Sequence, residues 1–226
     1  TAITFATLNT GGTTTYTWTN NNTDIGLAAS STGNPTGIPS FTATNTSNQA
    51  ITATITVIPT FTNGLISCTG PAKTFTITVN PTPQVVATPT SQVICADGST
   101  SIQLSSTTVG TTPITYAWSS AVTTAPTGGN ISGLVNQTTP GATSLINNTL
   151  INIGTSPGIV TYTITPYIGE CSGTPILVPV TVNPKGQVND IANQTLCRDA
   201  STTAITFATL NTGGTTTYTW TNNNTD

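Results

Sequence analysis

The sequence predicts an all-β protein built of tandem β-sandwich modules, and three observations support this fold class. Apolar residues alternate with Thr along several short segments, which is the two-residue period of a half-buried strand. Clusters of Gly, Pro and Asn interrupt these segments, and no segment keeps the period of a helix. Residues 1–24 and 203–226 are identical. We therefore expect the chain to be part of a tandem array with a period of 202 residues.

Four segments show the alternation most clearly. In each, the apolar residues fall on one face, where they can form a core, and Thr falls on the other face. The segments are 15–19, 51–57, 74–79 and 160–165. Thr fills 58 of the 226 positions, and its β-branched side chain suits a pleated, half-buried surface.

A weaker repeat lies inside the 202-residue period. Val-Asn-Pro ends a predicted strand twice, at Val79–Pro81 and at Val182–Pro184. Cys95 precedes Trp118 by the same 23 residues that separate Cys197 from Trp220. The period therefore holds two diverged modules. We expect a first module at 1–80 that lacks its first strands, a complete second module at 81–183, and the first strands of the next copy at 184–226.

A Tyr-x-Trp sequence marks the same strand in each module. Several short strands with one Trp near the first third are typical of an immunoglobulin-like sandwich, in which that Trp is buried. The Tyr lies two residues earlier, on the same face of the strand. The predicted core positions are Tyr16, Trp18, Tyr116, Trp118, Tyr218 and Trp220. The alternative is that the Trp side chains are exposed platforms for sugar stacking.

The composition argues against several functions. Only 4% of the residues are charged, with three Lys or Arg and six Asp or Glu, so we expect no nucleic-acid partner. No apolar run is long enough to insert into a membrane. There is no His, no paired acids and no nucleophile motif, so we expect no enzyme, no cofactor and no metal site. A calcium ion at a module junction, held by Asp190 or Asp199, stays open as an alternative.

Four motifs together resemble a known family. They are Val79–Pro83, Ile94–Gly98, Tyr116–Trp118 and Val160–Gly173. Their order and spacing resemble the PKD-like and immunoglobulin-like tandem domains of giant surface proteins in Bacteroidetes, some of which are gliding adhesins. The resemblance implies an extended array of PKD-like sandwiches, an extracellular location at the cell surface and export by type IX secretion. Residues 197–200 depart from the pattern, because the Gly that usually follows Cys is missing.

The four cysteines allow two pairings in an exported array. Pairing within a module would join Cys95 to Cys171 and leave Cys68 and Cys197 with partners outside residues 1–226. Pairing between neighbouring modules would join Cys68 to Cys95 and Cys171 to Cys197. The regular spacing of the cysteines fits both pairings, since any two-module repeat with fixed Cys positions has such a spacing. We favour the first pairing, and buried free thiols remain a third interpretation.

These observations predict a structural repeat of a secreted surface adhesin or filament, which provides length and multivalent display. Its expected partners are neighbouring repeats of the same chain, with surface polysaccharide or other adhesin copies as further candidates. The alternative is a carbohydrate-binding repeat, which requires aromatic residues exposed outside the core. Phe41, Phe61 and Tyr167 are the candidates for that role.

Overall fold

The computed structural model describes residues 2–31 and 36–224. The predicted all-β fold class is confirmed, because within the described residues every regular element is a strand except the 3₁₀ turn η1 (Thr23–Ile25). The chain divides into two compact units. Unit 1 holds Thr1–Gln84, Ser106–Thr115 and Pro166–Thr174, and unit 2 holds Val85–Ser105, Tyr116–Thr165 and Pro175–Asp226.

This division cuts across the module boundaries expected from the sequence, because unit 1 takes in residues 81–84, 106–115 and 166–174 of the expected second module. The sequence-based boundaries therefore stay a prediction. Below, "first module" means residues 1–80, "second module" means residues 81–183, and "third segment" means residues 184–226.

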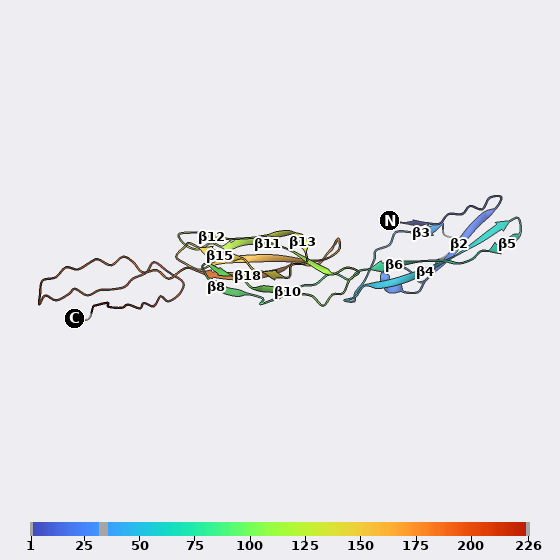
Figure 1. Ribbon diagram of the computed structural model, residues 1–226. Helices are drawn as coiled ribbons and strands as arrows, with labels where there is room; N and C mark the ends of the chain where they lie inside the picture. The colour runs from blue at the N-terminus through green and yellow to red at the C-terminus, as the bar shows by residue number, and fades with distance from the viewer. Residues whose placement is uncertain (1, 32–35, 225–226) are drawn as a thin grey trace. The chain divides into compact units, whose positions relative to one another are not determined.

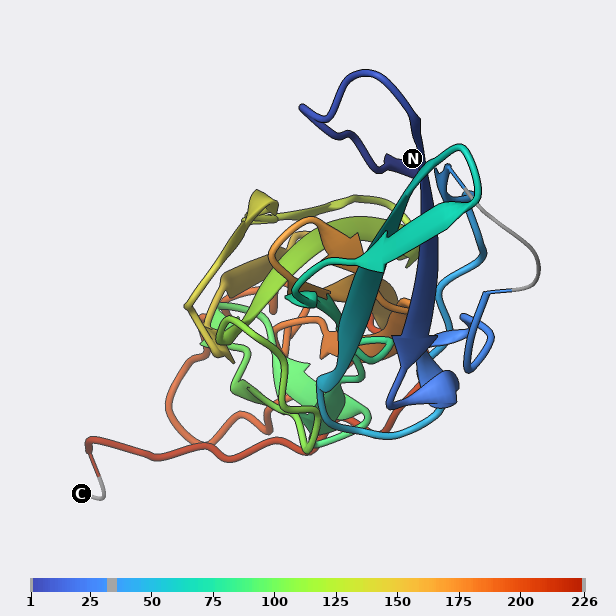
Figure 2. The ribbon, with the colours of Figure 1, turned by 90° about the vertical axis from the view of Figure 1, so that its right-hand side faces the viewer.

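The first module is organised around β4 (Ile51–Asn63), the longest strand among the described residues. Its two antiparallel neighbours in the sheet are β2 (Thr13–Asn20) and β6 (Lys73–Val79), and it also forms a hairpin with β5 (Ile66–Thr69) (Figures 1 and 2). The short strands β1 (Ile3–Thr4) and β3 (Gly37–Ile38) pair separately. The core forms because Ala53, Ile55 and Val57 of β4 turn inward, while the Thr residues between them do not.

The second module contains one large sheet, in the order β13-β11-β16-β18-β8, with β17 paired to β16. Smaller sheets, β14-β10-β7 and β12-β15-β9, contribute further buried residues such as Ile102 and Leu150. The strands of the large sheet are β8 (Gln92–Cys95), β11 (Ile114–Thr124), β13 (Gln137–Gly141), β16 (Gly158–Ile168), β17 (Cys171–Ser172) and β18 (Ile176–Asn183). The others are β7 (Val86–Thr88), β9 (Gly98–Ser99), β10 (Ile102–Ser105), β12 (Ile131–Ser132), β14 (Leu145–Ile146) and β15 (Thr149–Asn152).

The two central strands of this sheet alternate as the sequence predicts. Val160, Tyr162 and Ile164 of β16 are fully buried, and so are Val180 and Val182 of β18. Thr lies between the buried residues of β16. Strand β8 then joins the other edge of β18 in parallel, with Val180 opposite Gln92 and Asn183 opposite Cys95. The first module has no segment that corresponds to β8 in the sequence, so β6 pairs only with β4 among its described residues.

The predicted core aromatics divide into two groups. Tyr16 (9% exposed), Trp18, Tyr116 and Trp118 are buried, whereas Trp220 is 72% exposed and Tyr218 is partly exposed. For Trp220 the expectation of a core position is therefore wrong in this chain. The physical reason is that Trp18 lies on β2, opposite Val57 of β4, and the 226 residues contain only one copy of the β4 sequence. Among residues 184–224, which are described, no strand forms.

Candidate functional site: the repeat junctions

The first junction joins the first and second modules, and all its residues lie within unit 1. The backbone N–H of Val109 donates to the carbonyl of Asn48 at 2.8 Å, and the N–H of Ala50 donates back to the carbonyl of Val109 at 2.8 Å. The N–H of Thr111 donates to Oδ1 of Asn80 at 2.9 Å. The loop before β11 is therefore bonded to the segment before β4.

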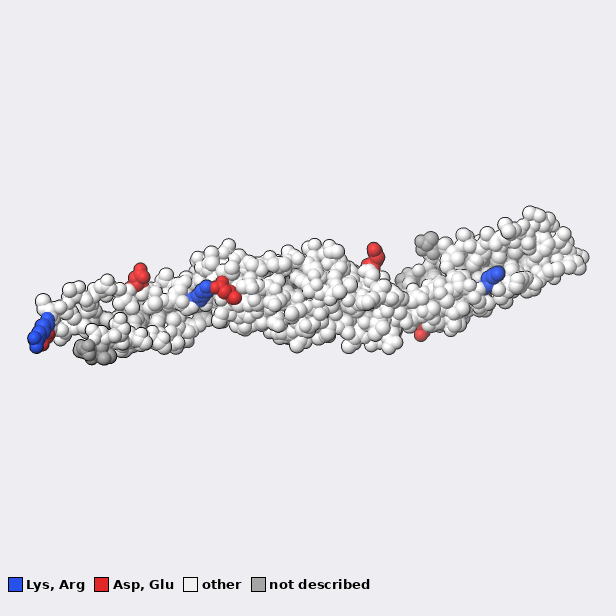
Figure 3. All heavy atoms as spheres, viewed as in Figure 1, with Lys and Arg blue, Asp and Glu red and all other residues white. Residues whose placement is uncertain are grey.

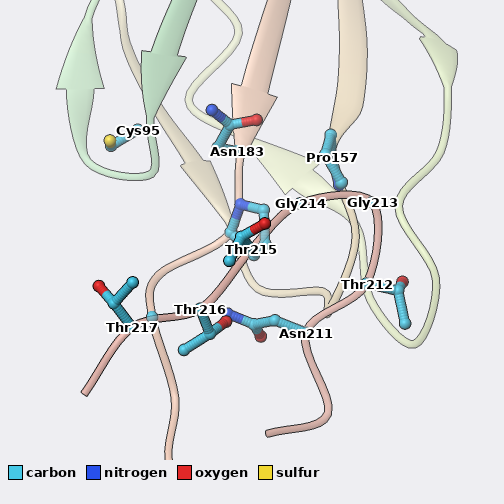
Figure 4. Close-up of a pocket in the computed structure, with 12 residues that line it drawn as sticks. Cys95, Pro157, Asn183, Asn211, Thr212, Gly213, Gly214, Thr215, Thr216 and Thr217 are labelled. Atoms are coloured by element: carbon cyan, nitrogen blue, oxygen red, sulfur yellow. The ribbon is translucent and has the colours of Figure 1, made fainter.

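The second junction joins the second module to the third segment, and all its residues lie within unit 2. The N–H of Thr212 donates to the carbonyl of Thr155 at 2.8 Å. Nδ2 of Asn211 donates to the carbonyl of Lys185 at 2.7 Å. Gly213, with φ +77°, packs so closely on Pro157 that a Cβ would lie 2.8 Å from the proline Cδ. A loop of the repeated sequence therefore rests on the end of the second sandwich (Figure 4).

The two junctions use equivalent parts of the repeat. Asn48 and Thr155, which supply the acceptor carbonyls, each lie three residues before a central strand, β4 or β16. Val109 and Thr212, which supply the N–H donors, each lie in the loop before the Tyr-x-Trp sequence. The same backbone contact thus recurs at two successive junctions whose side chains differ.

A cavity of about 480 Å³ opens at the second junction. Figure 4 shows Cys95 and Asn183 on its second-module side and residues 211–217 of the third segment around it. The lining carries no acid or base among the described residues. Beside it, Lys185 forms an ion pair with Asp97, and the two side chains are 65% and 45% exposed. Exposed ion pairs of this kind contribute little to stability.

All four cysteines, Cys68, Cys95, Cys171 and Cys197, are exposed free thiols. Cys95 lies opposite Asn183, and the neighbouring Val182 lies opposite Gly158 at the start of β16. Cys171 lies opposite Ile168 at the end of β16. The ten residue-to-residue steps from Gly158 to Ile168 span about 33 Å, whereas the Cα atoms of a disulfide lie within about 7 Å. The pairing of Cys95 with Cys171 favoured from the sequence does not fit this register.

A buried polar network holds the second sandwich together. Nδ2 of Asn148 donates to the hydroxyl oxygen of Tyr162 at 3.0 Å and to the carbonyl of Val135 at 3.1 Å, and the N–H of Asn148 donates to Oγ1 of Thr100 at 2.8 Å. Burial raises the pKa of Tyr162, and its hydrogen bonds with Asn148 and Thr100 oppose that shift. Burial also raises the pKa of Tyr116. Every member has a partner, so this cluster is structural and offers no reactive group.

The described residues offer few other groups that could bind a ligand or a metal ion. They contain no group of three or more His, Cys, Asp or Glu that could hold a metal ion. Figure 3 shows that charged side chains are few and scattered over the face in view. In the described part of the chain, no helix is both long and apolar enough to span a membrane. Phe41, Phe61 and Tyr167, the candidate sugar platforms, are each partly buried.

Comparison with known proteins is consistent with this architecture. Residues 92–186 match the family model of a PKD-like domain. The PKD-like match runs from the start of β8 to just beyond β18, so it covers the large sheet and most of the smaller strands beside it. It agrees with an immunoglobulin-like sandwich for the second module.

One similar solved structure is described as surface layer protein SbsC, domains 4–9. It is 19% identical to this chain, with a TM-score of 0.30, and the match covers 85% of this chain. This chain spans 25% of the length of that one. No curated protein matches this sequence.

Sequence reasoning missed the junction contacts because most of them are made by the backbone. The main-chain groups come from Asn48, Val109, Thr155 and Thr212. Because almost every residue type carries the same main-chain N–H and C=O groups, the sequence does not show which residues form such contacts. Asn80, Asn211 and Gly213 are the exceptions. The two Asn side chains form hydrogen bonds at the junctions, and a positive φ beside a neighbouring proline needs a residue without Cβ at Gly213. Gly11 is the equivalent residue in the first copy and also has a positive φ, but a Cβ at Gly11 would have no other atom within 4 Å.

Proposed function

We propose that this chain is a structural repeat of an extracellular surface protein, in which sandwich modules joined in series provide length and repeated display. The observation that carries the proposal is the recurrence of one backbone contact at two successive junctions, in a chain whose ends are copies of each other. A chain that only linked independent domains would need no repeated contact between them. The PKD-like match supports modules of this type.

The surface composition supports the same role. Charged residues are scarce, and rows of Thr lie on the outward faces of β2, β4 and β6. Such faces are hydrated but attract few ions or polyelectrolytes. We further propose cell-surface adhesion, with gliding as one setting, because the motifs resemble those of surface adhesins. Neighbouring repeats, other copies of the chain and surface polysaccharide are the proposed partners.

The test is to express chains with one, two and four complete 202-residue periods and to measure the maximum dimension of each by small-angle X-ray scattering. An 11-residue strand spans about 36 Å, so two modules in series should add about 60–80 Å per period. A constant increment supports the proposal. An increment that shrinks as copies are added indicates that the modules collapse together, which contradicts it. A glycan array with the same chains tests the carbohydrate-binding alternative.

A further inference from the structure

The two cysteine positions of the repeat lie at opposite ends of a module. In the second module, Cys95 lies at the end where the chain leaves, because it is opposite Asn183, the last residue of β18. The N–H of Ala96, the next residue, donates to the carbonyl of Asn183 at 2.9 Å. Cys95 therefore faces whatever follows the second module.

Cys171 lies at the end where the chain enters. Its cross-strand partner Ile168 packs against Gly110, where a Cβ would lie 2.5 Å from Cγ2 of Ile168. Gly110 lies between Val109 and Thr111, the two donors that bind the first module. Gly173, two residues after Cys171, contacts the carbonyl of Pro83. Cys171 therefore lies beside the junction with the preceding module.

The first module shows what would surround Cys95 if the next copy were complete. Thr14 lies opposite Phe61 on β4, and Phe61 lies opposite Cys68 on β5, so the three residues form one row across the sheet. The repeat equivalent of Thr14 is Thr216, which lines the cavity together with Cys95. A row of two strand spacings is about 10 Å long. The next copy's Cys68 would thus lie beside the cavity that Cys95 already lines.

We propose that these cysteines form disulfides across the repeat junctions. Cys95 pairs with the equivalent of Cys68 in the following copy, and Cys171 pairs with the equivalent of Cys197 in the preceding copy. The inference rests on the tandem continuation in the proposed function. It differs from both pairings considered from the sequence. It also leaves all four cysteines unpaired within residues 1–226, as the structure has them.

The reaction needs an external oxidant. Two thiols lose two protons and two electrons as the S–S bond forms, and a protein disulfide of the thiol–disulfide exchange class accepts them and is reduced to two thiols. Exposed thiols are accessible to such a partner, and an exported protein matures in a compartment where the product persists. A junction closed in this way would combine a covalent bond with the backbone contacts described above.

The test extends the chain by its own sequence. Residues 203–226 already repeat residues 1–24, so appending residues 25–80 after Asp226 completes a second copy of the first module and adds a fifth cysteine, a copy of Cys68. After oxidation in a glutathione buffer, peptide mapping by mass spectrometry should find one disulfide, between Cys95 and that copy. Thiol titration should find three free thiols in the extended chain and four in the original chain.

Matched variants separate the possible pairings. In the extended chain, Cys95→Ser should leave all four remaining cysteines free, whereas Cys171→Ser should keep the disulfide and leave two thiols. In a second arm, residues 184–202 are placed before Thr1, and their copy of Cys197 should pair with Cys171.

Several outcomes would overturn the proposal. They are a disulfide between Cys95 and Cys171, one between Cys197 and the appended copy, the Cys68–Cys95 or Cys171–Cys197 bonds, or an oxidised chain in which every thiol stays free. None of them affects the scattering test of the proposed function, which measures length alone.

Discussion

Trp18 and Trp220 occupy the same position of an identical 24-residue sequence, yet Trp18 is 5% exposed and Trp220 is 72% exposed. Local sequence cannot account for this difference. Trp18 is covered because β2 pairs with β4, and β4 brings Val57 opposite Trp18. The contrast shows that the strand and the burial of its Trp depend on the rest of the module.

The first prediction follows from this contrast. Appending residues 25–80 after Asp226 supplies the missing copy of β4, so Trp220 should become buried. Acrylamide quenching of tryptophan fluorescence should detect one accessible indole of three in the original chain and none in the extended chain. The emission maximum should also shift to the blue. If Trp220 remains quenchable in an extended chain that shows the expected strand content, pairing with β4 is not what buries Trp18.

A second prediction uses the repeat as its own control. A Cβ at Gly12 would press on the carbonyl of Thr62 and lie 2.6 Å from Cζ of Phe61, whereas nothing lies within 4 Å of a Cβ at Gly214. Gly12→Ala should therefore destabilise the first module by about 1–3 kcal/mol, and Gly214→Ala should change stability by less than about 0.5 kcal/mol. Urea unfolding of both variants measures the difference. Equal effects would contradict the packing assigned to Gly12.

The alternating strands could be predicted from the sequence because burial follows a period of two. Ala53, Ile55 and Val57 are buried on β4, and Val160, Tyr162 and Ile164 are buried on β16, as their alternation with Thr indicates. These segments carry their own signal. The neighbouring strand that buries each of these segments lies elsewhere in the sequence. Trp220 lacks a copy of that neighbouring strand, and for this reason the core position expected for Trp220 is wrong.

The cysteine positions could not be predicted for a related reason. Cys95 and Cys171 belong to one module by spacing, but the parallel pairing of β8 with β18 places Cys95 at the start of β16, while β17 places Cys171 at its end. Parallel pairing depends on a crossover between distant segments. Strand β8 has only four residues, of mixed exposure, and so short a segment does not indicate which strand it pairs with.

A third prediction concerns the buried network around Tyr162. Asn148→Ala removes the side-chain amide that donates to Tyr162 and Val135, so the buried network loses two hydrogen bonds. The free energy of unfolding should fall by about 1–3 kcal/mol. Asn147, the exposed neighbour, provides the control, since Asn147→Ala should have an effect below about 0.5 kcal/mol. Chemical denaturation followed by near-UV circular dichroism measures both.

A fourth prediction is a loss of stability at high pH. Burial raises the pKa of Tyr162 and of Tyr116 in the folded chain, so the unfolded chain releases these protons first. The stability that the neutral tyrosines contribute is fully present below the ordinary tyrosine pKa of about 10. It is lost as the pH rises through the raised pKa values of the folded chain. Tyr162→Phe should flatten the fall in unfolding free energy above a pH of about 10, measured relative to the variant's own stability at a pH of about 8. An unchanged slope would contradict a raised pKa at Tyr162.

A fifth prediction tests the second junction. Asn211 donates to the carbonyl of Lys185 at 2.7 Å, while its copy Asn9 is exposed. Asn211→Ala should speed hydrogen exchange at the N–H of Thr212, which is bonded to Thr155, because the loop is less firmly held. Asn9→Ala should leave that exchange rate unchanged. Slow exchange in both variants would show that the backbone contact holds without the side chain.

The parallel pairing of β8 with β18 has a mechanical consequence. The chain enters the second module before β8 and leaves it directly after β18. A pull on the two ends of the module would draw these strands past each other along their length, since they run in the same direction. Their hydrogen bonds would then be loaded in shear and would have to break together. An antiparallel pair at the same place would open one bond at a time, under a smaller force.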